Sequence, residues 1–258
     1  MTTRRPKKSL GQHFLVDQNL LGVIGRHADL DADDVVLEIG PGTGILTRYL
    51  ADRVGMVHAI ELDGALEGSL RSALEGTSNV QLVLGDAVRF DYGTLDPAPT
   101  KLVSNLPYNV ATPIVVESLD RIPSLERWVV MVQLEVAERF FASPRTKAYG
   151  AVSVLMQLHT RRLGSHRVPP TAFRPRPRVD SAIVGFERHP GPRLELVRPV
   201  VEASFAHRRK TLANSVAHAG LASRDEAERA LAAIGRAAGV RAEELAPQEF
   251  VALAEELG

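Results

Sequence analysis

The chain contains no cysteine. Disulfides, thiolate zinc sites and cysteine nucleophiles are therefore excluded. The same absence excludes methylation of pyrimidine C5 by an enzyme that adds a cysteine to the ring. None of the eight histidines forms an HExxH pair, so we also predict that the protein has no metal site.

Long apolar runs are also absent. No run reaches 18 apolar residues, so we expect no membrane span. The N-terminus has no apolar core, so we expect no secretory signal and a cytoplasmic protein. With 258 residues, 45% of them apolar and 24% charged, the chain is long enough for one α/β domain and a smaller one.

The chain has no excess of either charge, but its basic residues are clustered. The segment from Thr160 to Ser215 has twelve Arg and Lys against four acids, a surplus of eight. A local basic surface on a neutral protein indicates a polyanionic partner. A second basic group is in the N-terminal arm, residues 1–9. The predicted phosphate contacts from both groups are Arg4, Arg5, Lys7, Lys8, Arg174, Arg176, Arg178, Arg208, Arg209 and Lys210.

From Val35 to Val132, short apolar runs alternate with amphipathic segments. This alternation predicts an α/β fold with a doubly wound, Rossmann-like sheet and right-handed crossovers. A hairpin joined by a Pro-rich stretch should add an antiparallel edge, and Ala151–His159 should pack on the sheet as a helix. The predicted strands are Val35–Ile39, Met56–Ile60, Val80–Leu84, Lys101–Ser104 and Trp128–Val132, with Thr160–Val168 and Ser181–Glu187 in the hairpin.

A Pro- and Gly-rich stretch at residues 188–192 indicates a linker. It divides the chain into a predicted catalytic domain, residues 1–188, and a small helical domain, residues 189–258. Within the second domain, Ser223 and Glu226 have the spacing of a capping box, which predicts a helix start.

Three glycines, Gly40, Gly42 and Gly44, follow a predicted strand and open a helix. Such a loop lets backbone N–H groups approach a ligand closely. A dinucleotide fingerprint would need its third glycine at Ile45. The spacing E-x-G-x-G-x-G is instead typical of enzymes that bind S-adenosyl-L-methionine. Glu38, inside the strand, is expected to brace the loop.

Two acids end the next two strands. Glu61 can accept both ribose hydroxyls of a nucleoside, and Asp86 can accept from the adenine amino group. Ligands of open α/β sheets bind at the carboxyl ends of the strands, so these acids should share one pocket with the glycine loop. Their neighbours Leu62 and Ala87 are also predicted to contact the cofactor.

The segment Asn105–Tyr108 reads Asn-Leu-Pro-Tyr and follows the fourth strand. The Asn105 side-chain carbonyl and the backbone carbonyl of Leu106 or Pro107 can accept both N–H bonds of adenine N6. Tyr108 can stack on the base. The segment therefore predicts methyl transfer to an exocyclic amine, driven by orientation and electrostatics. Asn105 should contact the cofactor as well.

From about Lys8 to Ser215 the chain resembles the KsgA and Erm family of rRNA adenine N6-dimethyltransferases. The resemblance implies that His13 and Leu15 contact the cofactor and that Phe173 helps to hold the target base. His13 stands where the family often has Asn. The segments that carry the resemblance are Leu10–Leu15, Glu38–Gly44, Glu61–Asp63, Gly85–Ala87, Asn105–Tyr108, Phe173–Ser181 and Arg208–Thr211.

Two of these segments, Phe173–Ser181 and Arg208–Thr211, resemble the small-subunit enzymes most. The resemblance implies dimethylation of two adjacent adenosines in a 3′-terminal hairpin of 16S rRNA, within an assembling ribosomal particle. The basic residues would hold RNA phosphates, the C-terminal domain would contact the RNA or the ribosome, and the enzyme would be a monomer. The target base must be flipped or unpaired to reach the pocket.

Three other functions remain open at this point. One is an Erm-type methyltransferase of large-subunit 23S rRNA. Another is a ribosome-assembly factor that mainly binds an immature particle. The third, a DNA adenine methyltransferase, is less favoured because those enzymes usually have an acidic residue at the position of Asn105.

Overall fold

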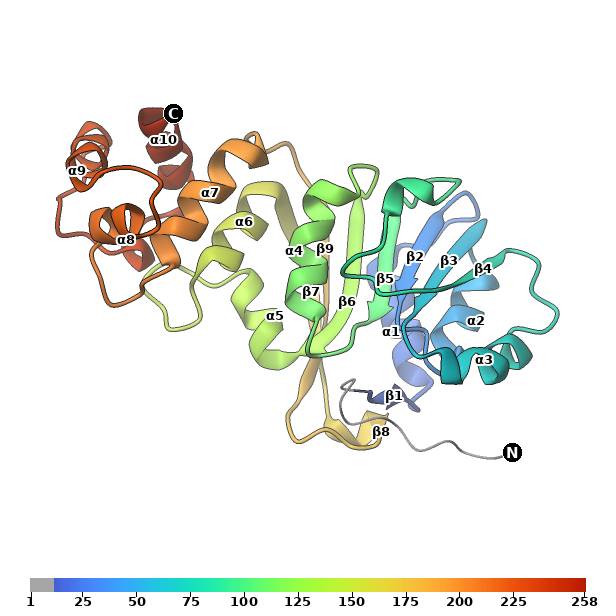
Figure 1. The fold of residues 1–258 in the computed structure, drawn as a ribbon. Coiled ribbons are helices and arrows are strands. Elements are labelled where there is room, and N and C mark those ends of the chain that lie inside the picture. The colour runs from blue at the N-terminus through green and yellow to red at the C-terminus, as the bar shows by residue number, and fades with distance from the viewer. Residues whose placement is uncertain (1–11) are drawn as a thin grey trace. The chain divides into compact units, whose positions relative to one another are not determined.

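A computed structural model of the chain describes residues 12–258 (Figure 1). The predicted contacts Arg4, Arg5, Lys7 and Lys8 lie outside the described residues. The chain divides into two compact units. The first contains the residues up to Ala137 together with Arg162–Arg188, and the second contains Glu138–Arg161 and His189–Gly258.

The first unit is built on a seven-stranded sheet in the order β4-β3-β2-β5-β6-β9-β7. Neighbouring strands from β4 to β6 are parallel, and β9 runs antiparallel to β6. The predicted Rossmann-like sheet with an edge hairpin is therefore confirmed. The strands are β2 (Val35–Ile39), β3 (Met56–Glu61), β4 (Val80–Leu84), β5 (Lys101–Asn105), β6 (Arg127–Gln133), β7 (Thr160–Val168) and β9 (Ser181–Arg188).

Helices cover both faces of this sheet (Figure 1). On one face, Leu20, Ile24 and Leu50 pack with Val103 and Met131 in a core of buried side chains. On the other face, Trp128 donates from its indole N–H to the Ser118 hydroxyl at 2.8 Å. Burial of apolar area of this extent is the main stabilising term of the unit. The helices are α1 (Asn19–Ala28), α2 (Ile45–Ala51), α3 (Glu67–Ala73) and α4 (Ala111–Arg121), and α5 (Leu134–Phe140) begins in this unit and ends in the second.

Helix α1 and a two-stranded ribbon were not anticipated from the sequence. Strand β1 (Phe14–Leu15) pairs antiparallel with β8 (Phe173–Arg174), so that Leu15 lies opposite Phe173. Two residues are too few to give a strand pattern in a sequence. The apolar spacing of Leu20, Leu21, Ile24 and Ala28 did carry a signal for α1, because all four are buried on one face of the helix.

The second unit is helical apart from Thr160 and Arg161, the first two residues of β7. Its aromatic side chains meet in the interior: the Phe205 ring lies 5.9 Å from Tyr149 and 5.6 Å from Phe250. The predicted capping box is confirmed, because the Glu226 N–H donates to the Ser223 hydroxyl at 3.2 Å and the Ser223 N–H donates to the Glu226 carboxylate at 2.8 Å. The helices are α6 (Ala151–His159), α7 (Leu194–Phe205), α8 (Leu212–His218), α9 (Arg224–Ala233) and α10 (Pro247–Leu257).

Helix α6 corrects one expectation. Its apolar pattern predicted packing on the sheet, but α6 packs against α7 and α10. An apolar helix face fits any apolar partner of similar shape, so the pattern alone did not identify the partner. The predicted division after residue 188 coincides with one boundary between the units, and residues 138–161 group with the C-terminal helices.

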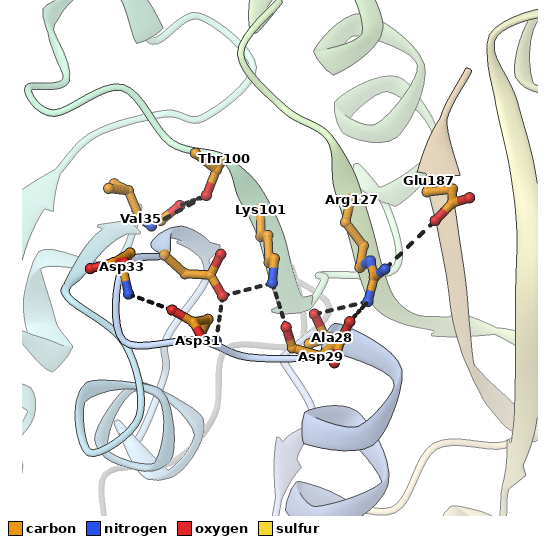
Figure 2. Close-up of polar contacts among 10 residues, drawn as sticks. Ala28, Asp29, Asp31, Asp33, Val35, Thr100, Lys101, Arg127 and Glu187 are labelled. Carbon is orange, nitrogen blue, oxygen red and sulfur yellow. Dashed lines mark hydrogen bonds and ion pairs between the residues drawn. The ribbon is translucent and has the colours of Figure 1, made fainter.

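Charged side chains link the amino-terminal ends of the central strands (Figure 2). Lys101 Nζ lies 2.7 Å from an Asp34 carboxylate oxygen and also donates to the Asp29 carbonyl. Arg127 joins the Asp29 carboxylate at 3.1 Å to Glu187 at 3.6 Å. These contacts connect the loop after α1 to β5, β6 and β9, at the end of the sheet opposite the carboxyl ends of the parallel strands.

Replacing Lys101 by Ala should lower the free energy of unfolding by about 2 kcal/mol. The Lys101 and Asp34 side chains are only 13% and 11% exposed, so the substitution leaves a largely buried carboxylate without its cation. Urea unfolding of the variant measures the loss. The matched control is Arg71→Ala, which breaks an exposed helical pair with Glu67 and should cost less than about 0.5 kcal/mol. Equal losses of unfolding free energy in the two variants would contradict a stabilising role for the buried Lys101–Asp34 pair.

Candidate active site

A cavity opens at the carboxyl ends of β2, β3, β4 and β5. The chain leaves β2 toward β3 on one side and β5 lies on the other, so the strand order reverses here. Ligands of doubly wound sheets bind at such a reversal. The predicted site residues that line this cavity are His13, Leu15, Gly40, Gly42, Glu61, Leu62, Asp86, Ala87, Asn105, Leu106, Pro107 and Tyr108.

The glycine loop bends in a way that only glycine tolerates well. Gly40, Gly42 and Gly44 have φ angles of 73°, 59° and 79°. A Cβ at Gly42 would also stand 2.8 Å from the Phe14 ring. Gly44 does not line the cavity; a Cβ there would stand 2.8 Å from Leu70 of α3, so this glycine allows close packing behind the loop.

The carboxylate of Glu61 fastens this loop to the end of β3. It accepts from the Gly42 N–H at 3.1 Å and from the Asp63 N–H at 2.8 Å. Glu61 is 5% exposed, and this burial raises its pKa, whereas the two backbone donors act in the opposite direction. A carboxylate has about four acceptor positions, so capacity remains for a ligand's hydroxyls.

Glu38 lies in β2 at the floor of the cavity. It is 1% exposed, and its Oε2 atom has no hydrogen-bond partner. The pKa of Glu38 is raised to about 8, mainly by burial. The charge of Glu61 acts in the same direction as burial, and Thr47 acts in the opposite direction. At neutral pH this side chain is therefore mostly protonated.

Asp86 follows β4 at the rim of the cavity. One of its oxygens accepts from the Val88 N–H at 3.0 Å, and the other can accept from a ligand in the cavity. Its neighbour Ala87 is 9% exposed, whereas Leu62 across the rim is 56% exposed. An exposed leucine beside a polar rim provides an apolar surface for a flat ligand.

Asn105 and His13 are joined by a hydrogen bond. The Asn105 side-chain N–H donates to the His13 carbonyl at 3.0 Å. Since a carbonyl can only accept, this bond assigns the amide nitrogen to His13 and directs the amide oxygen away from it. The His13 imidazole donates from Nδ1 to the Pro175 carbonyl at 2.7 Å.

Both the ring and the hydroxyl of Tyr108 make contacts within the site. Its ring lies 5.2 Å from the His13 ring at an interplanar angle of 32°. Its hydroxyl shares a hydrogen bond with Ser181, the first residue of β9. Ser181 was not singled out as a site residue from the sequence, because serine side chains carry no distinctive pattern.

Phe173 pairs with the cavity-lining residue Leu15 but does not itself line the cavity. It is 1% exposed and belongs to the core that α1 covers. Its contact with a target base stays a prediction.

The predicted basic contacts fall in both units. Arg174, Arg176 and Arg178 are exposed in the first unit, the first at the end of β8 and the other two on the segment between β8 and β9. In the second unit, Arg209 is exposed, whereas Arg208 donates to the carbonyls of Lys147 and Tyr149 at 3.1 and 3.2 Å. Lys210 Nζ lies 2.7 Å from His218 Nε2.

Residues 12–258 contain neither a metal-binding cluster nor a membrane-spanning helix. No group of three or more His, Asp or Glu side chains there is arranged to hold a metal ion. No helix in the same range has the length and apolarity required to cross a membrane.

The fold and cavity define an α/β methyltransferase. A dimethyladenosine transferase from Plasmodium falciparum has the same fold, with a TM-score of 0.78 and 23% identity over 93% of this chain and 96% of that one. The 23S rRNA methyltransferase ErmE has a TM-score of 0.68 and 31% identity over 95% of this chain and 99% of its own.

The sequence comparisons are more specific. A family model described as "Ribosomal RNA adenine dimethylase" matches residues 3–257. The chain is 49% identical over 253 residues to the ribosomal RNA small subunit methyltransferase A of Rubrobacter xylanophilus, covering 97% of this chain and 95% of that one. The corresponding protein of Kineococcus radiotolerans is 45% identical over 97% of this chain and 85% of its own.

The chain therefore belongs to the ribosomal RNA adenine dimethylase family, whose members transfer methyl groups from S-adenosyl-L-methionine to adenines of rRNA. The expectations of fold, enzyme class and cofactor are confirmed.

Replacing Glu38 by Gln should remove a pH dependence of stability. The unfolded chain ionises this carboxyl near 4.5 and the folded chain near 8, so the unfolded state becomes more favoured as pH rises between these values. The cofactor-free wild type should therefore lose about 1 kcal/mol more than Glu38→Gln for each pH unit from 6 to 8.

Urea unfolding at three pH values measures this difference. The matched control is Glu75→Gln, which removes an exposed carboxylate from the same unit. If the unfolding free energy of Glu38→Gln depended on pH as steeply as that of the wild type, the raised pKa of Glu38 would be contradicted.

Proposed function

We propose that the protein dimethylates N6 of two adjacent adenosines in a 3′-terminal hairpin of 16S rRNA, and that the cavity at the ends of β2–β5 is where it does so. The observation that carries the proposal is the convergence of Asn105, Tyr108 and three carboxyl groups on one cavity. The small-subunit substrate is supported by relatives named small subunit methyltransferase A at 49% and 45% identity, against 31% for the 23S rRNA enzyme.

The carboxyl groups around the cavity suit S-adenosyl-L-methionine. This ligand has a sulfonium and an ammonium group, and Glu38, Glu61 and Asp86 offer carboxyl oxygens around the cavity. The unpartnered Oε2 of Glu38 is a buried polar atom that a polar group of the ligand would satisfy. Glu61 would accept the ribose hydroxyls, Asp86 the adenine amine, and the glycine loop would lie against the methionine portion.

Asn105 would orient the nucleophile. The bond to the His13 carbonyl occupies the amide nitrogen, so the amide oxygen is available to accept from adenine N6. The second acceptor is best assigned to the Leu106 carbonyl, because the Pro107 carbonyl already accepts from the Val110 N–H at 3.1 Å. Two acceptors aimed at one amine would make N6 more pyramidal and draw its lone pair out of conjugation with the ring, toward the methyl donor.

The bound cofactor supplies an electrophilic methyl group. Asn105 and Leu106 would stabilise the positive charge that develops on N6, and Tyr108 would hold the base by stacking. The proton leaves N6 after transfer, when the amine has become acidic, so the pocket needs no strong base. The monomethylated amine then presents its remaining N–H for a second transfer.

The basic residues are not equivalent as RNA contacts. Arg174, Arg176 and Arg178 are exposed and have no side-chain partner within residues 12–258, so we assign them to phosphates. Arg209 has the same status in the second unit. Arg208 is engaged by two carbonyls and lies 3.7 Å from Glu243, so a structural role competes with RNA binding there. Lys210 can bind phosphate beside His218.

The proposal includes the setting of the reaction. We infer that the substrate is rRNA within an assembling small subunit, that the enzyme acts as a monomer in the cytoplasm, and that the C-terminal helices contact the particle. The exposed basic side chains of both units support this setting, because phosphate contacts position a protein on folded RNA.

Labelled S-adenosyl-L-methionine should methylate under-methylated small subunits, with N6,N6-dimethyladenosine as the product found by digestion and mass spectrometry. Protein-free large-subunit rRNA should take up no label. Label in the large-subunit sample alone would identify the 23S enzyme instead. Cofactor binding without label in either sample would favour a binding role in assembly.

Replacing Asn105 by Ala should lower kcat about 100-fold, because the variant loses the acceptor that orients N6. Affinity for S-adenosyl-L-methionine should fall less, within about tenfold, since Glu61 and Asp86 are unchanged. Single-turnover methylation and calorimetry measure the two quantities. The matched control is Asn19→Ala, an exposed asparagine outside the cavity lining, which should keep the wild-type rate. A variant Asn105→Ala with wild-type kcat would exclude the assigned role.

A further inference from the structure

Ser181 lies beside the active site although it is far from Tyr108 in sequence. Strand β9 is antiparallel to β6, so its first residue pairs with Gln133 at the carboxyl end of β6. Strand β5 is the other neighbour of β6, and Tyr108 follows it. The Ser181 and Tyr108 side chains therefore meet across the end of β6, where their hydroxyls share a hydrogen bond.

The environment of this bond favours a fixed geometry. Ser181 is 0% exposed and Tyr108 is half-buried. Burial raises the pKa of Tyr108, against a smaller opposite effect of the bond to Ser181, so the phenol stays protonated near neutral pH. A buried hydrogen bond between two neutral hydroxyls meets little competition from water.

The bond also links two parts of the site. Ser181 ends the segment that carries Arg174, Arg176 and Arg178, and Leu134 donates to the Asp180 carbonyl at 3.0 Å to hold the start of β9. The Tyr108 ring is flanked by His13, whose imidazole binds the Pro175 carbonyl of the same segment. The orientation of the tyrosine ring is thus set from the segment assigned to RNA.

We propose that Ser181 is a positioning residue for methyl transfer, and that its hydroxyl holds the Tyr108 ring in the orientation that stacks on the target adenine. The inference rests on the proposed function. Ser181 does not line the cavity and acts only through Tyr108. Stacking by a ring that is already oriented avoids the loss of ring freedom on substrate binding, which speeds transfer without adding a contact to the cofactor.

A double-mutant cycle of Ser181→Ala and Tyr108→Phe tests this role. Phenylalanine keeps the stacking ring and removes only the hydroxyl. Each single variant should lower kcat on under-methylated small subunits about three- to tenfold, the effect of one hydrogen bond. The double variant should be no slower than either single variant, because both remove the same bond. KM for the subunits and the Kd of S-adenosyl-L-methionine should stay within about twofold of wild type.

Ser118→Ala is the matched control for the loss of a buried serine hydroxyl. Ser118 is 2% exposed, accepts from the Trp128 indole N–H and does not line the cavity. This variant should lose stability and keep the wild-type kcat at a temperature where it is folded.

Several outcomes would overturn the positioning role. One is a wild-type kcat in folded Ser181→Ala. Others are a double variant whose loss is the product of the single losses, and a Tyr108→Phe variant as fast as wild type. Absence of methyl transfer by the wild-type enzyme would instead overturn the proposed function, so the two failures are distinguishable.

Discussion

The hydrogen bond from the Gly42 N–H to the Glu61 carboxylate is the contact on which the site depends. It ties the loop after β2 to the end of β3, and it forms only because the glycines accept positive φ angles. The second oxygen of Glu61 accepts from the Asp63 N–H. This bond fixes the turn that precedes α3. One buried carboxylate thus orders the loops after β2 and β3, and both loops line the cavity together with residues that follow β5.

This arrangement concentrates acidic groups where a cation is to be bound. Glu38 and Glu61 are both buried, and burial raises the pKa of each carboxyl group. Desolvated acids destabilise a folded protein, so their presence at one cavity indicates that ligand binding offsets the cost. The rest of the first unit supports this arrangement with an apolar core on one face and the Lys101 and Arg127 contacts at the opposite end of the strands.

The basic residues illustrate how far a charge count can mislead. The surplus between Thr160 and Ser215 predicted a polyanion surface, yet Arg188 donates to the carbonyls of Leu125, Leu119 and Ile122 and stacks over Trp128. Arg208 is likewise tied to backbone carbonyls. An arginine has five donors, so it serves as readily to join loops as to bind phosphate, and only its surroundings distinguish the two uses.

The sequence by itself determined the strands of the parallel sheet, the glycine loop, the acids at the strand ends and the Asn105–Tyr108 segment. Each of these is encoded by neighbouring residues, as an apolar periodicity, a turn or a motif spacing. The family followed from the same motifs. Tertiary structure alone decided that Ser181 meets Tyr108, that Phe173 is enclosed in the core, and that α6 packs with the C-terminal helices. These contacts join residues far apart along the chain. The sequence offers many serines, phenylalanines and apolar helix faces of the same chemistry, and only the strand order and the packing of the folded chain determine which of them meet.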